Sequence, residues 1–548
     1  MKYIISTCLL MFLTLNVSWG QSTVGLTEYT SGNKEGFVLF SPMTSSNTYL
    51  IDKCGEKVHQ WSTSSYRPAL SVTLLEDGSL VRTGKLDNPN FNEGGSGGII
   101  ERFDWDGNLT WNYTISDTDN CLHHDIKVLP NGNILCIVWD RYTKQEAVQN
   151  GKDTSYNQQY LWSEKIVELQ PVGNNNATVV WEWKLFDHLI QENDNTQLNY
   201  GVVSEHPELI DINYFPGAPN TADWIHFNSI DYNPDLDQIL VSSHRMCEVW
   251  IIDHSTTTAE AATHTGGNSG MGGDLLYRWG NPQAYSRGTG ANKVFYGQHH
   301  ATWIPNGYPN EGKIMVFNNG LGRLGDYSSI DIIIPPLNAS NTYDVPSSTP
   351  FLPTGLDWSY VSNPQSDFYS SNISGVYPLD NGSFMITEGT SGRFFEINPF
   401  QQKLWEYVNP VFSGGIANQG DTVTGNPVFR CEFYNSDYEA FVGKDLTPQG
   451  EIELNPMTPS MCELVGIAQV ENETSFSLFP NPFTTELHYS IGDENEGVFE
   501  LYDALGTRVI QEPVQHSGMI KTNFLPAGMY YYQLKVGSKI VTGKLVKP

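Results

Sequence analysis

Three histidines of this 548-residue chain stand at the same distance from a tight-turn residue, which is the kind of spacing that assembles a reactive site. His124, His226 and His299 each precede an asparagine by seven positions. If each turn closes an equivalent hairpin, the three imidazoles hold equivalent strand positions and converge. A neutral imidazole is a nucleophile that accepts a transferred group and so divides one difficult displacement into two easier steps. The alternative chemistry for three imidazoles is a metal site with an open position.

The same count places a cation in the predicted site. Arg430 precedes the turn residue Asp437 by seven positions, and a guanidinium binds a tetrahedral oxyanion through parallel hydrogen bonds. His123 and His300 are each one residue off this count, so on a strand their side chains point to the opposite face. We expect these two histidines to support the site, with His123 as the replacement if the register slips.

These residues lie in short β-rich segments that repeat along most of the chain. Asn-Gly and Asp-Gly turns separate the segments, and long amphipathic helical patterns are scarce. Six comparable units follow one another, each with an outer strand pair and an inner strand that enters a tight turn. This pattern predicts an all-β fold, a six-bladed β-propeller whose inner strands line a central channel. A pair of β-sandwiches or a β-helix is the alternative, but a β-helix needs shorter and more uniform repeats.

The two ends of the chain differ in character from the propeller, which we assign to residues 21–447. Lys2, an apolar run at 4–15 and small residues near position 20 are typical of a secretory signal peptide over 1–20. Short alternating strands from about position 474 predict a small C-terminal β-sandwich over 474–548, after a linker at 448–473. No later stretch reaches about 20 apolar residues, so we expect no transmembrane segment.

The composition limits the partners of the chain. A formal net charge of −31 repels nucleic acid and anionic lipid, and an anionic small molecule needs a local pocket of positive charge to bind. No phosphate-binding loop or strand-linked dinucleotide motif occurs, so we expect no cofactor. Six of the seven cysteines remain after the predicted signal peptide, and the sequence does not choose their pairing.

Three segments resemble the PAPS-independent aryl-sulfate sulfotransferase family: HHDIKVLPNGN (123–133), DWIHFNSIDYNPDLDQILVSS (223–243) and QHHATWIPNGYPNEGKIMVFNNG (298–320). With the blade pattern, the resemblance covers about residues 35–445. It implies that His299 is the nucleophile and forms a sulfohistidine, while His124 and His226 bind the sulfuryl oxygens or shuttle a proton. It also implies ping-pong transfer from a phenolic sulfate donor to a phenolic acceptor.

The chain departs from this family at the arginine that binds the sulfuryl group. The family has a Ser-Ser-Arg pattern, whereas here Ser242 and Ser243 are followed by His244 and Arg245. A shift by one residue on a strand reverses the face that a side chain occupies. Either a bulge restores Arg245 to the site, or another cation replaces it, for which Arg430 is the candidate. His244 stands at the arginine's position and is a further substrate-binding candidate.

The C-terminal segments FPNPF (479–483), YDALGTRV (502–509) and LPAGMYYYQL (525–534) resemble the sorting domain of the type IX secretion system of Bacteroidetes. This implies translocation by the secretion machinery, removal of the domain, and release or attachment at the cell surface. Two other functions stay open from the residues alone. One is a surface propeller that binds glycans or sulfated ligands without turnover, and the other is an enzyme with a histidine-bound metal.

Overall fold

The computed structural model describes residues 22–214, 221–457, 462, 477–491, 496–503, 507–536 and 539–547. The predicted signal peptide at 1–20 and most of the predicted linker at 448–473 lie outside these residues. The chain divides into two compact units, Met1–Met461 and Cys462–Pro548, which are described separately.

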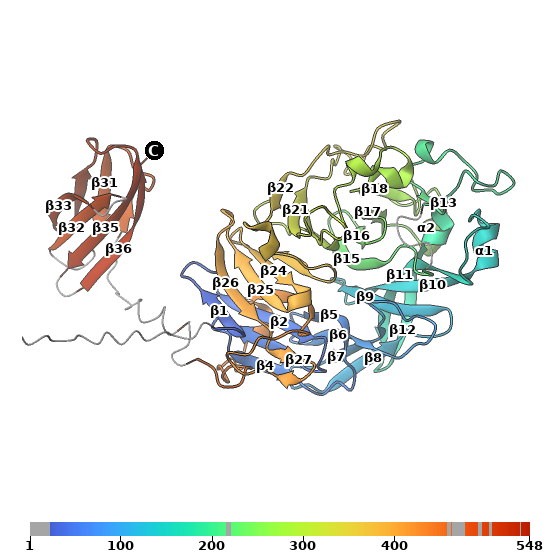
Figure 1. Ribbon diagram of the computed structural model, residues 1–548, viewed down its shortest axis with the longest axis horizontal. Coiled ribbons are helices and arrows are strands. Elements are labelled where there is room, and N and C mark those ends of the chain that lie inside the picture. Colours follow the sequence, from blue (N-terminus) through green and yellow to red (C-terminus); the bar gives the residue numbers. More distant parts are fainter. Residues whose placement is uncertain are drawn as a thin grey trace, which may run out of the picture. The chain divides into compact units, whose positions relative to one another are not determined.

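Six antiparallel sheets of four or five strands dominate the described part of the first unit (Figure 1). From the innermost strand outward, the first three sheets are β5 (Pro68–Leu74), β6 (Leu80–Lys85), β7 (Gly98–Phe103), β8 (Leu109–Thr114); β9 (Asn120–Val128), β10 (Ile134–Thr143), β11 (Tyr160–Val172), β12 (Asn176–Lys184); and β15 (Phe227–Asn233), β16 (Gln238–Ser243), β17 (Glu248–Asp253), β18 (Leu275–Trp279). The other three are β19 (His299–Trp303), β20 (Ile314–Asn318), β21 (Ser329–Ile333), β22 (Trp358–Tyr360); β23 (Gly375–Pro378), β24 (Phe384–Glu388), β25 (Arg393–Ile397), β26 (Lys403–Val408), β1 (Gly25–Tyr29); and β29 (Val428–Asn435), β2 (Gly36–Pro42), β3 (Thr48–Asp52), β4 (Lys57–Trp61).

The innermost strands form a closed ring. β5, β9, β15, β19, β23 and β29 neighbour one another in this order, and β29 lies against β5 again. The closing sheet joins both ends of the unit, because β29 pairs with β2 from Asn435↔Gly36 to Val428↔Pro42. Each inner strand is the edge strand of its own sheet, and the radial arrangement leaves these edges short and protected. The predicted all-β propeller with a small β-rich C-terminal domain is confirmed.

Short elements connect the sheets. Two short α-helices, α1 (Lys144–Gln149) and α2 (Thr258–Ala261), each begin with a threonine capping box. The 3₁₀ turns are η1 (Leu185–His188), η2 (Val203–Glu205), η3 (Pro282–Tyr285), η4 (Gly290–Asn292), η5 (Gln365–Asp367), η6 (Gly389–Ser391) and η7 (Glu439–Phe441). Two small ladders pair β13 (Leu189–Ile190) with β14 (Ile210–Asp211) and β27 (Val411–Phe412) with β28 (Gly415–Ile416).

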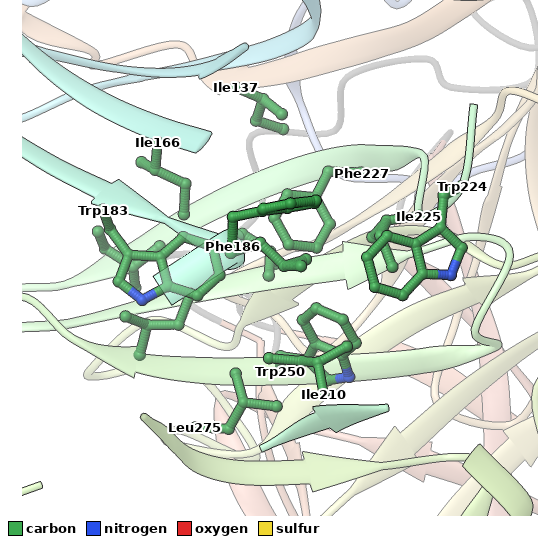
Figure 2. Close-up of a cluster of buried hydrophobic side chains, with 14 of the residues drawn as sticks. Ile137, Ile166, Trp183, Phe186, Ile210, Trp224, Ile225, Phe227, Trp250 and Leu275 are labelled. Carbon is green, nitrogen blue, oxygen red and sulfur yellow. The ribbon is translucent and has the colours of Figure 1, made fainter. Parts of the chain in front are cut away.

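Apolar side chains fill the space between neighbouring sheets. Figure 2 shows the cluster that joins the β9–β12 sheet to the β15–β18 sheet. Ile137, Ile166, Trp183, Phe227 and Trp250 in this cluster are all fully buried. Burial of each isoleucine or phenylalanine contributes about 1.5–3 kcal/mol, so such clusters hold the inner strands at fixed separations.

The hairpin turns follow the sequence count in most sheets. The glycine after the counted turn residue has φ between +81° and +85° at Gly78, Gly132, Gly307 and Gly382, a conformation that glycine adopts without steric cost. Two turns differ: Asn233 ends β15 and pairs with Gln238, and Asp437 is followed by Tyr438 and not by a glycine. The three counted histidines differ in strand assignment, because His124 lies within β9, His299 begins β19 and His226 immediately precedes β15.

The cysteines take two chemical forms. Cys54 and Cys462 are disulfide-bonded, whereas Cys121, Cys136, Cys247 and Cys431 are buried free thiols. Burial raises the pKa of the Cys121 and Cys247 thiols, so neither is a poised nucleophile.

The described part of the second unit contains two antiparallel sheets. One is β30 (Ser477–Phe479), β31 (Glu486–Ser490) and β34 (Ser517–Lys521); the other is β33 (Arg508–Val514), β32 (Gly497–Asp503), β35 (Gly528–Val536) and β36 (Lys539–Lys547). A cluster that includes Leu487, Phe499, Leu501 and Ile520 forms its own core. Within the described residues of both units, none of the helices is long and apolar enough to cross a membrane.

A buried ion pair connects the two sheets where the ring closes. Lys53, in the turn between β3 and β4, places Nζ 2.8 Å from Oε2 of Glu396 in β25, and the two side chains are 1% and 0% exposed. The Glu396 carboxylate also accepts a hydrogen bond from the backbone nitrogen of Lys34 at 2.9 Å.

Lys53→Met is expected to lower the free energy of unfolding by about 3–5 kcal/mol, because Glu396 keeps a buried charge without its cation. Denaturant unfolding followed by tryptophan fluorescence measures the change. Lys313→Met is the matched control, since Lys313 and Asp357 pair at 2.6 Å with side chains 23% and 31% exposed, and we expect a loss of less than about 1 kcal/mol. Equal losses in the two variants would contradict the role given to Lys53.

Candidate active site

Four imidazoles and one phenyl ring form a closed circle among the innermost strands. Ring centroids are 4.5 Å apart for His124 and His226, 5.2 Å for His226 and His244, and 5.2 Å for His244 and His299. Phe429 of β29 completes the circle at 6.4 Å from His124 and 6.5 Å from His299. We call the four histidines the histidine circle. The structure thus brings together four sequence-predicted histidines, namely the three counted ones and His244, the further substrate-binding candidate.

Irregular backbone aims these rings inward. His124 and His226 have φ values of +50° and +59°, in the left-handed region that non-glycine residues adopt infrequently. The pairing register of β9 with β10 shifts at this point, and the register of β19 with β20 shifts between His299 and Ala301. Bulges of this kind redirect a side chain from the alternating pattern of a strand, which explains why the circle draws on residues that simple alternation does not align.

Asn319 determines the tautomer of His299. Its amide nitrogen donates to the backbone oxygens of Ser370 and Ile373 at 2.8 and 2.9 Å, so its Oδ1 atom faces His299 Nδ1 at 2.8 Å and must accept a proton from it. Nε2 of His299 therefore carries the lone pair, and it accepts a hydrogen bond from the backbone nitrogen of Ile373 at 3.2 Å. Burial lowers the pKa of His299 to about 3, so the ring is neutral and nucleophilic at neutral pH.

Asp223 orients His226 and holds Arg245. Its Oδ2 atom lies 2.5 Å from His226 Nδ1 and 3.1 Å from Arg245 Nη2. Although burial opposes ionisation, the adjacent His226 and Arg245 hold the pKa of Asp223 below its usual range. Arg245 thus reaches the site through a carboxylate, and its side chain is 23% exposed. Arg245 therefore contacts Asp223, the hydrogen-bond partner of His226, and does not join the histidine circle.

His244 occupies the gap between His226 and His299. Its Nδ1 atom is buried and has no hydrogen-bond partner among the described residues. Burial, reinforced by the neighbouring His226 and His299, lowers the pKa of His244 well below its usual value. A neutral ring with an unpaired nitrogen in this position is available to an incoming ligand.

His123 lies behind His124 and connects it to a buried carboxyl group. The two Nδ1 atoms are 2.8 Å apart, and His123 Nε2 is 2.8 Å from Glu164 Oε2 with both side chains fully buried. Burial lowers the pKa of His123 and raises the pKa of Glu164 well above its usual value, so the proton belongs on Glu164. The Glu164 hydroxyl then donates to His123 Nε2, His123 Nδ1–H donates to His124 Nδ1, and His124 keeps its proton on Nε2.

One side of the circle is apolar. Phe429 packs with Leu70 and Ile373 in a buried cluster, with Met43 partly buried against it. The arrangement therefore offers imidazole nitrogens on one side and a hydrocarbon wall on the other, which suits a ligand with one polar and one aromatic end.

A family model for arylsulfotransferases (ASST) matches residues 25–437, and one for the secretion system C-terminal sorting domain matches residues 477–548. The chain belongs to the arylsulfotransferase family. The match supports aryl sulfotransferase activity in general, and the sorting domain points to export.

Other comparisons give weaker similarities. A protein of unknown function from Bacteroides caccae is 12% identical with a TM-score of 0.39, covering 73% of this chain and 98% of that one. Virginiamycin B lyase from Staphylococcus aureus is 12% identical with a TM-score of 0.32, covering 71% and 89%. No curated protein matches the chain.

Arg430 and His300 make their polar contacts outside the histidine circle of this arylsulfotransferase, although the Arg430 guanidinium lies 5.0 Å from the centroid of the Phe429 ring. Arg430 donates from both terminal nitrogens to the Asp125 carboxylate, which raises the pKa of the guanidinium in spite of burial. His300 Nδ1 accepts from the Val376 nitrogen at 3.1 Å. Both line a hollow of about 260 Å³ that shares lining residues with a larger one of about 1220 Å³ at the turn ends of the inner strands. No member of the histidine circle lines either hollow.

Several functional residues escaped the sequence reasoning. Asn319, Asp223 and Glu164 do not stand at the counted distance from a turn residue. Asp223 and Asn319 do lie within the segments 223–243 and 298–320 that resemble the family. Gly95 sits in the GGSGG loop (94–98) with φ +88°, and a Cβ atom there would stand 1.8 Å from His124 Cε1. Only glycine fits at this position, so the loop packs its backbone directly against the ring. No local signal in the sequence pairs this loop with His124.

The free energy of unfolding is expected to fall as the pH drops below about 6.5, the usual pKa of histidine. Between that pH and about 3, the folded-state pKa of His299, the unfolded chain binds a proton that the folded chain does not. Each such buried histidine contributes about 1.4 kcal/mol per pH unit, with the stabilisation fully present above the unfolded pKa. Denaturant unfolding at a series of pH values measures the slope.

His299→Gln is expected to reduce this slope by about one proton. His206→Ala is the control, because the His206 side chain is 47% exposed and paired only with Glu208. A slope that is the same in all three proteins would show that His299 titrates normally in the folded state.

Proposed function

We propose that this arylsulfotransferase transfers a sulfuryl group from a phenolic sulfate ester to a phenolic acceptor by a ping-pong mechanism, without a nucleotide donor, through a sulfohistidine at His299 Nε2. The observation that carries the proposal is the hydrogen bond from His299 Nδ1 to Asn319, which leaves the lone pair on Nε2, where it accepts a hydrogen bond from the Ile373 nitrogen. Neutral imidazole is the nucleophilic form, and the low pKa of His299 keeps it available.

In the first half-reaction, the His299 Nε2 lone pair leaves its hydrogen bond with Ile373 and attacks sulfur. The bond between sulfur and the aryl oxygen breaks, and the electron pair leaves with the phenolate. His226, whose Nδ1 faces the Asp223 carboxylate at 2.5 Å, donates its second proton from Nε2 to the phenolate oxygen. His299 keeps its proton on Nδ1 and donates it to Asn319 Oδ1. This hydrogen bond stabilises the positive charge that forms on the sulfated ring.

In the second half-reaction, the acceptor phenol replaces the released phenol. Neutral His226 takes the hydroxyl proton at Nε2, the phenolate oxygen attacks sulfur, and the sulfur–nitrogen bond breaks with return of the electron pair to His299. His299 is then unmodified again, and His226 carries the same protons as at the start of the reaction. Proton transfer by a positioned side chain of this kind contributes about 10²–10⁴-fold to the rate.

The sulfuryl oxygens need hydrogen-bond donors, and the circle supplies them from fixed side chains. His124 presents Nε2–H because the Glu164 and His123 protons are ordered behind it. His244 replaces the family's arginine as the group between the second motif and His299. Preorganised donors around the equatorial oxygens stabilise the charge that develops there. The aryl ring would pack on Phe429 and its apolar neighbours.

We also propose the export route that the two ends of the chain imply. The signal peptide at 1–20 would direct the chain across the inner membrane, and the domain at 474–548 would then engage the type IX secretion machinery. Between these two segments, the propeller would occupy residues 21–447 and the linker residues 448–473.

His299→Ala is expected to abolish turnover, with a loss of at least about 10⁴-fold in kcat, because the nucleophile itself is removed. Rapid mixing of the protein with a chromogenic aryl sulfate, without acceptor, should release a burst of phenol and add one SO₃ group to His299, as seen by mass spectrometry. His206→Ala is the control and should retain both. A normal burst in His299→Ala would place the covalent adduct elsewhere.

Asn319→Asp is expected to move the acid limb of the rate profile to higher pH. A carboxylate beside Nδ1 favours the imidazolium, raises the pKa of His299 from about 3, and so removes the nucleophilic form at a pH where the original protein is active. The pH dependence of kcat/KM measures the shift. Asn319→Ala is the control for lost packing and should lower the rate about 10–100-fold without that upward shift. An unmoved acid limb in Asn319→Asp would reject the role of Asn319.

A further inference from the structure

A second group of metal-ligating side chains lies at the outer strands, away from the histidine circle. His188 ends η1 after β12, His264 follows α2, and Asp274 immediately precedes β18. The Nδ1 atoms of His188 and His264 are each 2.8 Å from the same atom, Oδ1 of Asp274. One ligand atom from each residue lies within 4.8 Å of the other two. β12 and β18 are the outermost strands of their sheets, so this cluster is at the rim of the propeller.

The hydrogen bond on the far side of His188 defines its chemistry. His188 Nε2 lies 2.8 Å from the backbone oxygen of Ala261, which only accepts, so Nε2 carries a proton. In a neutral ring, Nδ1 then holds the lone pair and points it at a carboxylate oxygen 2.8 Å away. Two acceptors in contact need a cation between them, either a second proton on the ring or a metal ion. A backbone carbonyl on the distal N–H is the partner that metal-binding histidines commonly have.

The surroundings hold this ligand set rigidly and leave it open on one side. The His188 ring stacks on Trp183 at 5.5 Å with an interplanar angle of 4°, and Trp183 belongs to the core shown in Figure 2. Gly273 allows the backbone to approach, because a Cβ atom there would lie 2.6 Å from His188 Nε2. His188 and Asp274 side chains are 0% and 7% exposed, whereas His264 is 59% exposed. Two ligands are thus preorganised and the third admits an ion from solvent.

We propose that His188, His264 and Asp274 bind a divalent transition metal, with zinc as the best match, through two Nδ1 atoms and one carboxylate oxygen. Two imidazoles and a carboxylate form a common ligand set for zinc, with a fourth position for water. Bond lengths of about 2.0–2.2 Å require both 2.8 Å contacts to Asp274 Oδ1 to open slightly, through movement of the exposed His264 and a small rotation of the Asp274 carboxyl group. The ion would join the end of β12, the segment after α2 and the start of β18, so its effect is on stability instead of sulfuryl transfer.

The test uses the full chain after dialysis against a chelator. Zinc titration by calorimetry should show one strong site, elemental analysis should find one zinc per chain, and the melting temperature should rise with zinc. His264→Ala and Asp274→Asn should each weaken binding at least about 100-fold, more than loss of an outer partner does, and abolish the rise. His206→Ala, another exposed histidine paired with a carboxylate, should change neither.

The histidine circle is a competing zinc site, so the titration is repeated in His226→Ala. If His226→Ala still binds one zinc per chain and His264→Ala does not, the result supports a zinc site at His188, His264 and Asp274. Binding that disappears in His226→Ala but survives in His264→Ala would overturn the proposal, and so would absence of zinc binding in the original protein. The aryl sulfate assay is not involved, so the outcome is independent of the proposed sulfotransferase mechanism.

Discussion

The site depends on the polar partners that stand behind three of its four imidazoles. Asn319 holds His299, Asp223 holds His226, and the Glu164–His123 pair holds His124. A ring nitrogen without a partner in this interior would lose the hydrogen bonds it has in water, at a cost of about 1–3 kcal/mol. These partners therefore set which nitrogen carries a proton and prevent the rings from turning. The inward-facing atoms are prepared for chemistry before a ligand arrives, which is the arrangement that electrostatic catalysis requires.

In the proposed site, His244 takes the place of the family's arginine, which changes how charge would be supplied. A guanidinium is permanently charged and presents a fixed fork of donors, whereas the neutral imidazole of His244 offers one donor and one acceptor. Arg245 is still close, but it contacts Asp223, and its charge acts through His226. Arg430 is likewise committed to Asp125. In the proposed mechanism, oriented N–H groups would bind an anionic substrate within a strongly acidic protein, so local geometry would matter more than the net charge of −31.

The propeller fold makes this arrangement possible because one strand from each sheet reaches the centre. Packing between sheets, as in the cluster of Figure 2, fixes the spacing of those strands, and pairing of β29 with β2 closes the ring. The rim, in contrast, has loops with freedom to carry additional groups. His188, His264 and Asp274 lie there, where a bound ion would tie two neighbouring sheets together without touching the reacting atoms.

The sequence by itself determined the architecture and the main members of the site. Alternating short strands and Asn-Gly turns reflect local backbone preferences, so they identify the propeller, the β-rich C-terminal domain and the inner strands with His124 and His299. It did not determine where Arg245, Arg430 and His300 point, because a single bulge reverses a side chain and bulges depend on pairing with another strand. It also did not reveal Asn319 behind His299, Gly95 over His124, or Asp274 between two histidines. Those contacts join residues 10 to 86 positions apart, and only the closed tertiary structure brings such residues within hydrogen-bonding distance.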